Sequence, residues 1–122
     1  GASQIGGYFV QKEDGQIDWN LPAAEISNRL RAFTPWPGAF TWLVHSGKRR
    51  LLKIWQAQPL FESSSEPPGA IIQASRDGIQ VACGQGTLLV TEVQREGSRR
   101  MPAAEFLSGS PLQPGELLGQ NS

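Results

Sequence analysis

The sequence has 122 residues, the length of one ordinary domain, and 39% of them are hydrophobic, enough for one modest core. Its 14 Gly and 9 Pro require many turns, which favours short strands over long helices. Eleven basic residues balance eleven acidic ones, which argues against a self-sufficient, tight nucleic-acid binder, because such domains are usually strongly basic.

Membrane and disulfide signals are absent from the sequence. No run approaches the roughly 18 apolar residues that span a membrane, and nothing near Gly1 resembles a signal peptide. The single cysteine, Cys83, cannot form an internal disulfide, which fits a reducing compartment. We therefore expect a cytoplasmic domain without membrane association.

The N-terminal part of the chain divides into an irregular segment and a helix. Residues 1–11 show no periodicity, and we interpret them as a linker remnant that precedes a domain over residues 12–122. The spacing predicts an amphipathic helix over Leu21–Phe33, which Pro35 ends. Three apolar residues recur there at helical spacing: Ile26, Leu30 and Phe33.

Strand signals dominate the remainder of the chain, in short segments separated by turns that contain Gly. Five segments are predicted as strands: Phe40–His45, Arg50–Gln58, Ala70–Ala74, Ile79–Cys83 and Thr87–Val93. A short helix is expected over Pro102–Leu107, and the tail from Pro111 is expected to add an extended segment. The predicted fold is mainly β, a small antiparallel barrel of the oligonucleotide-binding (OB-like) type with an N-terminal helix and a short C-terminal helix. Another small barrel fits the same pattern.

Residues that could carry catalysis are scarce. The only histidine, His45, falls inside a predicted strand, and no other His or Cys stands at the spacing of metal ligands. Cys83 lacks a local activating group and is expected to be a buried, unreactive thiol. The run Gly84-Gln85-Gly86 lacks the Lys and the following helix of a phosphate-binding loop, so we interpret it as a hairpin turn. We predict no catalytic residues and no metal site.

Clustered basic residues leave binding as the expected role. Arginine suits phosphate because its guanidinium donates two parallel hydrogen bonds and stays charged. The clusters are Arg29 with Arg31, the Lys48-Arg49-Arg50 run with Lys53, and Arg99 with Arg100. A merely solvated hairpin explains the middle cluster as well as phosphate binding does. Trp42 and Trp55 lie on neighbouring predicted strands; they could stack on bases, but we interpret them as core residues.

Three stretches of the sequence resemble the C-terminal domain of methionyl-tRNA formyltransferases. They are Asp14-Gly15-Gln16-Ile17-Asp18-Trp19, the run ISNRLRAFTPWPGAF over Ile26–Phe40, and the closing segment Arg99-Arg100-Met101-Pro102-Ala103-Ala104-Glu105-Phe106-Leu107 with Gly109 and Leu112-Gln113-Pro114-Gly115-Glu116. The resemblance runs from about Lys12 to Gly119. Before Lys12, where the family commonly carries another Lys and a Pro, this chain has Gly6-Gly7-Tyr8-Phe9.

The resemblance implies an OB-like barrel that contacts tRNA. Such a domain helps to position the initiator Met-tRNA, whose α-amino group is formylated by 10-formyltetrahydrofolate in a separate N-terminal Rossmann-like domain, in protein biosynthesis. The catalytic residues and the cofactor of the parent enzyme would belong to that domain. Nine residues are candidates for tRNA contacts: Lys12, Arg29, Arg31, Lys48, Arg49, Arg50, Lys53, Arg99 and Arg100.

Two other functions fit the sequence. A related formyltransferase that acts on nucleotide sugars or free folate carries a similar domain, which would shape a small-molecule site or contact its neighbour. A structural or protein-interaction barrel would use the arginines only for solubility.

The resemblance to methionyl-tRNA formyltransferases also implies that Trp19, Phe33 and Trp36 anchor the helix against the barrel, and that Gly38 permits close approach of the backbone.

Overall fold

The structure is a computed structural model that describes residues 3–5, 8–10, 15–33, 38–45, 48–62 and 64–119. Two short strands, β1 (Ser3–Ile5) and β2 (Tyr8–Val10), pair antiparallel near the N-terminus. No periodicity in the sequence predicts regular structure in this segment, so this strand pair is a finding of the structure alone. Whether residues 1–11 form a linker outside the domain stays a prediction.

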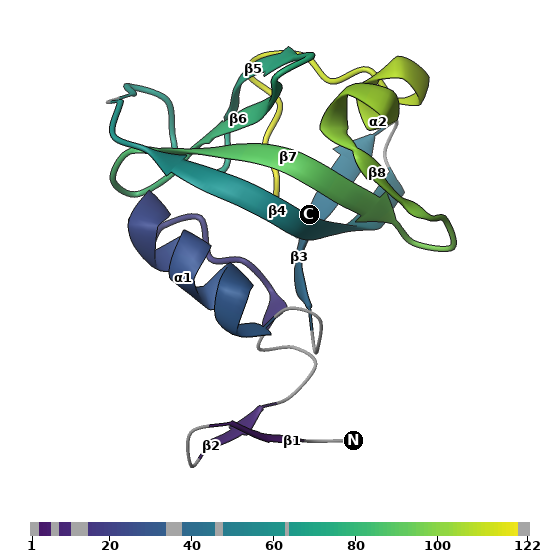
Figure 1. Ribbon diagram of the computed structural model, residues 1–122. Helices are drawn as coiled ribbons and strands as arrows, with labels where there is room; N and C mark the ends of the chain where they lie inside the picture. The colour runs from purple at the N-terminus through teal and green to yellow at the C-terminus, as the bar shows by residue number, and fades with distance from the viewer. Residues whose placement is uncertain are drawn as a thin grey trace.

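The main sheet has six strands, paired antiparallel in the order β3-β4-β7-β6-β5, with β8 added beside β7 (Figure 1). The strands are β3 (Ala39–His45), β4 (Lys48–Leu60), β5 (Ile71–Ser75), β6 (Gly78–Ala82), β7 (Thr87–Arg95) and β8 (Arg100–Pro102). The predicted mainly β, antiparallel architecture is therefore confirmed, and all five predicted strands are present. The end strands β3 and β5 do not pair with each other, so the predicted barrel is not closed by strand pairing. The sixth strand, β8, was not predicted.

Two helices lie on opposite sides of the β4–β7 pair (Figure 1). Helix α1 (Ala23–Phe33) follows the predicted periodicity, and its buried residues Ala23, Ile26 and Leu30 face β4. Helix α2 (Ala103–Gly109) lies against β7 and β8, where Phe106 is 2% exposed. Pro102 precedes α2 and forms no side-chain cap, because proline has no side-chain oxygen to accept a hydrogen bond from the first helical amides.

The core fills the interior of the curled sheet. It is formed by buried residues of all six strands of the main sheet and of both helices, among them Leu52, Ile54, Val81 and Val93. Trp19 is also buried, and its indole nitrogen donates a 3.0 Å hydrogen bond to the Thr41 hydroxyl. Trp19 thus anchors the segment before α1, as the resemblance implied. Trp36 lies outside the described residues.

Close backbone approach occurs at Gly38, as expected. Its φ is +88°, and a Cβ atom there would lie 2.3 Å from Cε of Lys53. Only glycine adopts this left-handed conformation without strain. The chain can therefore turn from the end of α1 into β3 beside the Lys53 side chain.

Candidate nucleic-acid interface

Strand β4 carries the middle basic cluster. Lys48, Arg49 and Arg50 occupy its first three positions and are exposed, whereas Lys53 is half-buried. Of the other predicted residues, Arg29 and Arg31 are on the exposed side of α1, and Arg99 and Arg100 lie at the start of β8. Lys12 lies outside the described residues. The structure therefore groups the β4 residues with β8, and it leaves the α1 arginines apart from them on a different element.

Acidic neighbours engage three of the predicted arginines. Arg29 lies 3.5 Å from Glu25 one turn earlier in α1, and Arg99 and Arg100 pair with Glu105 and Glu92. Arg31 donates a 2.8 Å hydrogen bond to Asn28. Exposed pairs such as Arg29–Glu25 contribute little stability but locally offset the positive charge.

The outer face of the sheet brings aromatic and basic side chains together across four strands. The strand register places Phe40 beside Lys53, Lys53 beside Gln94, and Gln94 beside Arg100. Trp42 and Trp55 share this face, because side chains two apart in a strand point the same way. We name the set the tryptophan face: Phe40, Trp42, Arg49, Lys53, Trp55, Gln94 and Arg100.

Cations lie over both tryptophans of this face. The guanidinium carbon of Arg49 is 4.2 Å from the ring centroid of Trp42, whose ring meets Phe40 edge-on at 5.8 Å. Lys53 Nζ and the guanidinium carbon of Arg100 are each 4.5 Å from the ring centroid of Trp55. Each such contact contributes about 0.5–1 kcal/mol at an exposed site. The tryptophans therefore hold the positions of three cationic side chains.

The interpretation of Trp42 and Trp55 as core residues is wrong. Both are only partly buried, while their strand neighbours Thr41 and Ile54 fill the interior. The signal was present in the sequence, since Trp55 has the same strand parity as Lys53 and opposite parity to Ile54. The alternation of side chains along β4, and not aromatic character, therefore predicts the face on which Trp55 lies.

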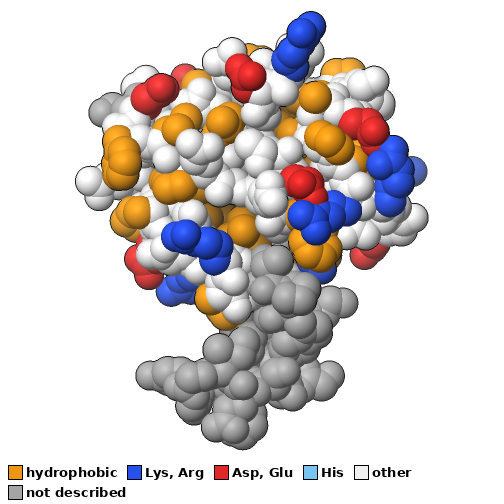
Figure 2. All heavy atoms as spheres, in the orientation of Figure 1, with side chains coloured by type: hydrophobic (Ala, Val, Ile, Leu, Met, Phe, Trp, Pro, Cys, Tyr) orange, Lys and Arg blue, Asp and Glu red, His pale blue; other side chains and the backbone are white. Residues whose placement is uncertain are grey.

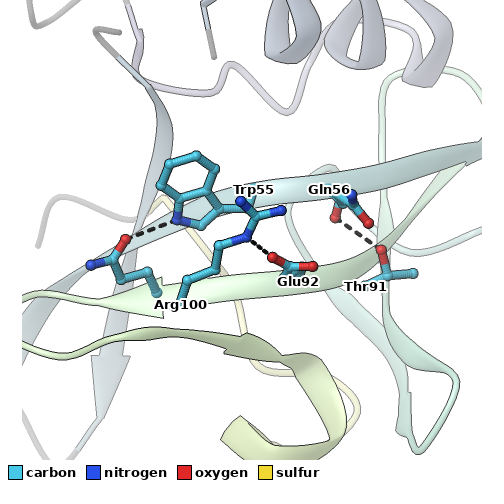
Figure 3. A network of polar contacts seen from close by, with 6 residues as sticks. Trp55, Gln56, Thr91, Glu92 and Arg100 are labelled. Atoms are coloured by element: carbon cyan, nitrogen blue, oxygen red, sulfur yellow. Dashed lines mark hydrogen bonds and ion pairs between the residues drawn. The ribbon is translucent and has the colours of Figure 1, made fainter. Parts of the chain in front are cut away.

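A local irregularity shapes the sheet around Trp55. The register between β4 and β7 shifts between Ile54 and Gln56 and again between Gln56 and Ala57. The Thr91 hydroxyl hydrogen bonds to the Gln56 carbonyl at 3.3 Å across this irregularity. Figure 3 shows Trp55, Glu92 and Arg100 converging beside it. Bulges of this kind redirect side chains on a sheet.

A groove with three arginines lies at the end of the sheet next to the tryptophan face. Its volume is about 650 Å³, and its lining includes Arg49, Arg50, Arg95, Glu96 and Leu112. We name it the arginine groove. In the described part of the chain, neither Arg50 nor Arg95 forms an ion pair with a carboxylate. These two guanidinium groups are therefore available to an anionic ligand.

Arg95 was missed in the sequence because it stands alone, five residues from Arg100. It reaches the groove because β7 pairs with β4, which sets Arg95 opposite Leu52. Arg50 and Arg95 line the same groove only because their strands pair. No pattern in the sequence around Arg95 could therefore have identified it as a residue of this groove.

Charge is distributed in small groups over the surface. On the face shown in Figure 2, Lys and Arg side chains alternate with Asp and Glu side chains and form no single large basic field. This distribution agrees with the formal net charge of zero. Binding of a polyanion at the tryptophan face would therefore depend on placed contacts more than on long-range attraction.

Cys83 and the run Gly84-Gln85-Gly86 both lie in structural positions. Burial raises the pKa of the Cys83 thiol from 9.0 to about 12, which confirms the expectation of an unreactive thiol. Gly84-Gln85-Gly86 forms the turn between β6 and β7, as expected. The side chain of His45 lies outside the described residues. Among those that are described, no group of three His, Cys, Asp or Glu side chains could hold a metal ion.

No described helix is long and apolar enough to cross a membrane.

Comparison with known proteins gives one consistent set of relatives. Residues 10–111 match the family model described as "Formyl transferase, C-terminal domain". A methionyl-tRNA formyltransferase of Citrifermentans bemidjiense is 49% identical over 92% of this chain and 33% of its own length. One from Myxococcus xanthus is 49% identical over 88% of this chain and 32% of its own length. The chain thus spans about a third of the length of these relatives.

A solved structure shares the fold. HypX from Aquifex aeolicus in complex with tetrahydrofolic acid aligns with a TM-score of 0.64 at 18% identity, over 92% of this chain and 21% of that one. At this identity the likeness concerns the fold alone.

Proposed function

Because this chain belongs to the formyl transferase C-terminal domain family, we propose that it is the tRNA-contacting domain of a methionyl-tRNA formyltransferase. The observation that carries the proposal is the set of cations on the tryptophan face and in the arginine groove, two sites that share Arg49. The tryptophan face holds Arg49, Lys53 and Arg100 over two indoles, and the adjoining arginine groove adds Arg50 and Arg95. This arrangement suits the phosphates of a folded RNA.

In the proposed enzyme this domain binds and another domain reacts. The relatives named above are about three times as long as this chain, which leaves room for a separate Rossmann-like domain. That domain would bind 10-formyltetrahydrofolate and formylate the α-amino group of the initiator Met-tRNA, in the cytoplasm, at the start of protein synthesis. Holding the tRNA at a distance would help to keep its aminoacyl end in a reactive geometry.

The proposed phosphate contacts predict salt-dependent binding. We expect the chain to bind initiator Met-tRNA with an affinity that falls steeply with salt, because each phosphate contact releases a counterion. The double substitution Arg50→Glu with Arg95→Glu should weaken binding and reduce the slope of log K against log salt by roughly 0.7–0.9 for each lost contact. Fluorescence anisotropy with labelled tRNA over a salt series measures both quantities.

Arg76→Glu is the control for each Arg→Glu change, so the single substitutions Arg50→Glu and Arg95→Glu are measured beside it. Arg76 is exposed in the turn between β5 and β6 and lines neither the groove nor the tryptophan face. It should leave the slope nearly unchanged. Absence of tRNA binding by the unsubstituted chain, or a slope that does not depend on Arg50 and Arg95, would contradict the proposal. Absence of binding would leave the alternatives of a small-molecule formyltransferase or a structural barrel.

A further inference from the structure

We propose that Arg100 is a phosphate-binding residue whose guanidinium is oriented by Trp55, Gln94 and Glu92. This inference rests on the proposed function, because it takes the ligand to be RNA. The inference concerns geometry as well as charge. It assigns the affinity to the direction in which the two terminal nitrogens of the Arg100 guanidinium point. The three orienting residues are positioning residues.

Trp55 has a fixed ring. Its indole nitrogen donates a 2.8 Å hydrogen bond to Oε1 of Gln94, and Nε2 of Gln94 donates a 2.7 Å hydrogen bond to the carbonyl of Ser98. Because the amide of Gln94 is used at both ends, its orientation is determined by its partners. Trp55 is therefore held from β7 and from the turn that leads to β8, and not by burial in the core.

Arg100 lies on this fixed ring and is held by a second contact. Its guanidinium carbon is 4.5 Å from the Trp55 ring centroid, and its Nε forms an ion pair with Glu92. In Figure 3 its terminal nitrogens point away from Glu92. The side chain remains 46% exposed. The contact with Glu92 thus uses the Nε side of the guanidinium and leaves the pair of terminal nitrogens toward solvent.

A phosphate group fits this arrangement. Two terminal guanidinium nitrogens match two oxygens of a phosphate, and a preorganised guanidinium loses little side-chain entropy on binding. Because Lys53 and Arg100 both lie over Trp55, a base could stack on this ring only by displacing a cation. Trp55 therefore supports the cations that contact the RNA backbone. The pair of Arg100 with Glu92 carries no net charge, so its contribution is directional.

Substitution of Arg100 separates direction from charge. Arg100→Lys keeps the charge but removes the planar guanidinium. We expect about five- to tenfold weaker binding of initiator Met-tRNA at fixed salt, with the salt dependence nearly unchanged. Arg76→Lys is the matched control, since Arg76 is exposed in the turn between β5 and β6 and lies over neither tryptophan. It should bind like the unsubstituted chain. Equal affinities for the Arg100→Lys and Arg76→Lys chains would overturn the inference.

Substitutions of the positioning residues provide an independent measurement. Trp55→Phe keeps an aromatic ring under Arg100 and should retain most of the affinity, whereas Trp55→Ala should resemble Arg100→Lys. Glu92→Gln keeps an oxygen that accepts from Nε and should bind at least as tightly as the unsubstituted chain. Glu92→Ala loses this acceptor and should bind more weakly than Glu92→Gln.

An account based on charge alone predicts equal gains for both Glu92 substitutions, and that result would also overturn the inference. If the unsubstituted chain binds tRNA while these variants do not differ, the proposed function stands and only the orientation of Arg100 is rejected. If the unsubstituted chain does not bind, the proposed function fails, and this inference fails with it. Thermal unfolding of each variant checks that the fold is retained.

Discussion

Trp19 and Trp55 show that the position of a tryptophan in the fold determines what its side chain does. Trp19 is 4% exposed and satisfies its indole nitrogen at Thr41, which is fully buried. Trp55 satisfies the same atom at Gln94 but remains on the outer face with cations over its ring. An indole tolerates both environments because only one of its atoms needs a hydrogen-bond partner. Residue type alone therefore does not separate an anchor in the core from a support on the surface.

The raised pKa of the buried Cys83 thiol predicts that the free energy of unfolding falls at high pH. Its pKa is about 12 in the folded chain and near 9.0 when unfolded, so the stabilisation is complete below pH 9 and is lost as the pH rises toward 12. In urea unfolding, the stability advantage of the unsubstituted chain over Cys83→Ala should shrink by up to about 1.4 kcal/mol per pH unit above that point. If the free energies of unfolding of the two chains differ by the same amount at every pH, this prediction is contradicted.

At the scale of elements, the start of α1 is attached to the turn between β6 and β7. The amide of Gly84 donates hydrogen bonds to the carbonyls of Trp19 at 2.9 Å and Leu21 at 3.1 Å. The amide of Ala23 donates to the carbonyl of Gln85 at 2.9 Å. The first turn of the helix thus finds an acceptor in a distant hairpin, which satisfies one of its unpaired amides. The hairpin turn Gly84-Gln85-Gly86 thus also serves as a docking point for the helix.

Replacement of Gly84 should disrupt this attachment. A Cβ atom there would lie 1.8 Å from the carbonyl oxygen of Asn20, so the backbone must move. We expect Gly84→Ala to lower the free energy of unfolding by about 2–3 kcal/mol, within the range for overpacking. Gly109→Ala is the control, because a Cβ atom at Gly109 meets nothing within 4 Å. Chemical denaturation of both variants tests the difference, and equal stabilities would contradict it.

Most elements could be predicted because their own sequence carries the signal. Helix α1 has apolar residues at helical spacing, and the five predicted strands are β-rich segments bounded by glycine turns. Strand β8 has only three residues, with Met101 as its one buried side chain, between Arg100 and Pro102. Its strand conformation comes from pairing with β7, which leaves no local pattern. The same pairing places Arg100 next to Gln94 in the candidate site.

At the scale of the whole molecule, the C-terminal tail joins the two edges of the sheet. Strands β3 and β5 are the ends of the strand order and do not pair with each other. Leu118 bridges to Leu43 of β3, and Leu117 bridges to Ala70 next to β5. The amide of Gly119 also donates a 2.8 Å hydrogen bond to the carbonyl of Trp42. The tail thus covers backbone groups that would otherwise form open sheet edges.

Removal of the tail should therefore destabilise the barrel as a unit. A chain that ends at Gly115 loses Leu118, which is 4% exposed, and the hydrogen bonds of residues 116–119. We expect a loss of at least about 2–3 kcal/mol in the free energy of unfolding, from the buried leucine alone. Gln113→Ala, at an exposed position of the same tail, is the control and should unfold like the full chain. Urea unfolding followed by tryptophan fluorescence measures this, and equal midpoints would contradict the assigned role.

The sequence by itself determined the mainly β architecture, the helix that ends at Phe33 and the basic run of β4. These follow from local periodicity, turn residues and residue chemistry, which need no partner strand. Only the tertiary structure decided which cations act together. Strand pairing brings Arg95 to the groove of Arg50 and sets Arg100 over Trp55, and the parity of β4 turns that tryptophan outward. Contacts between residues far apart in the chain depend on register, and register is fixed by burial of the opposite face of the sheet.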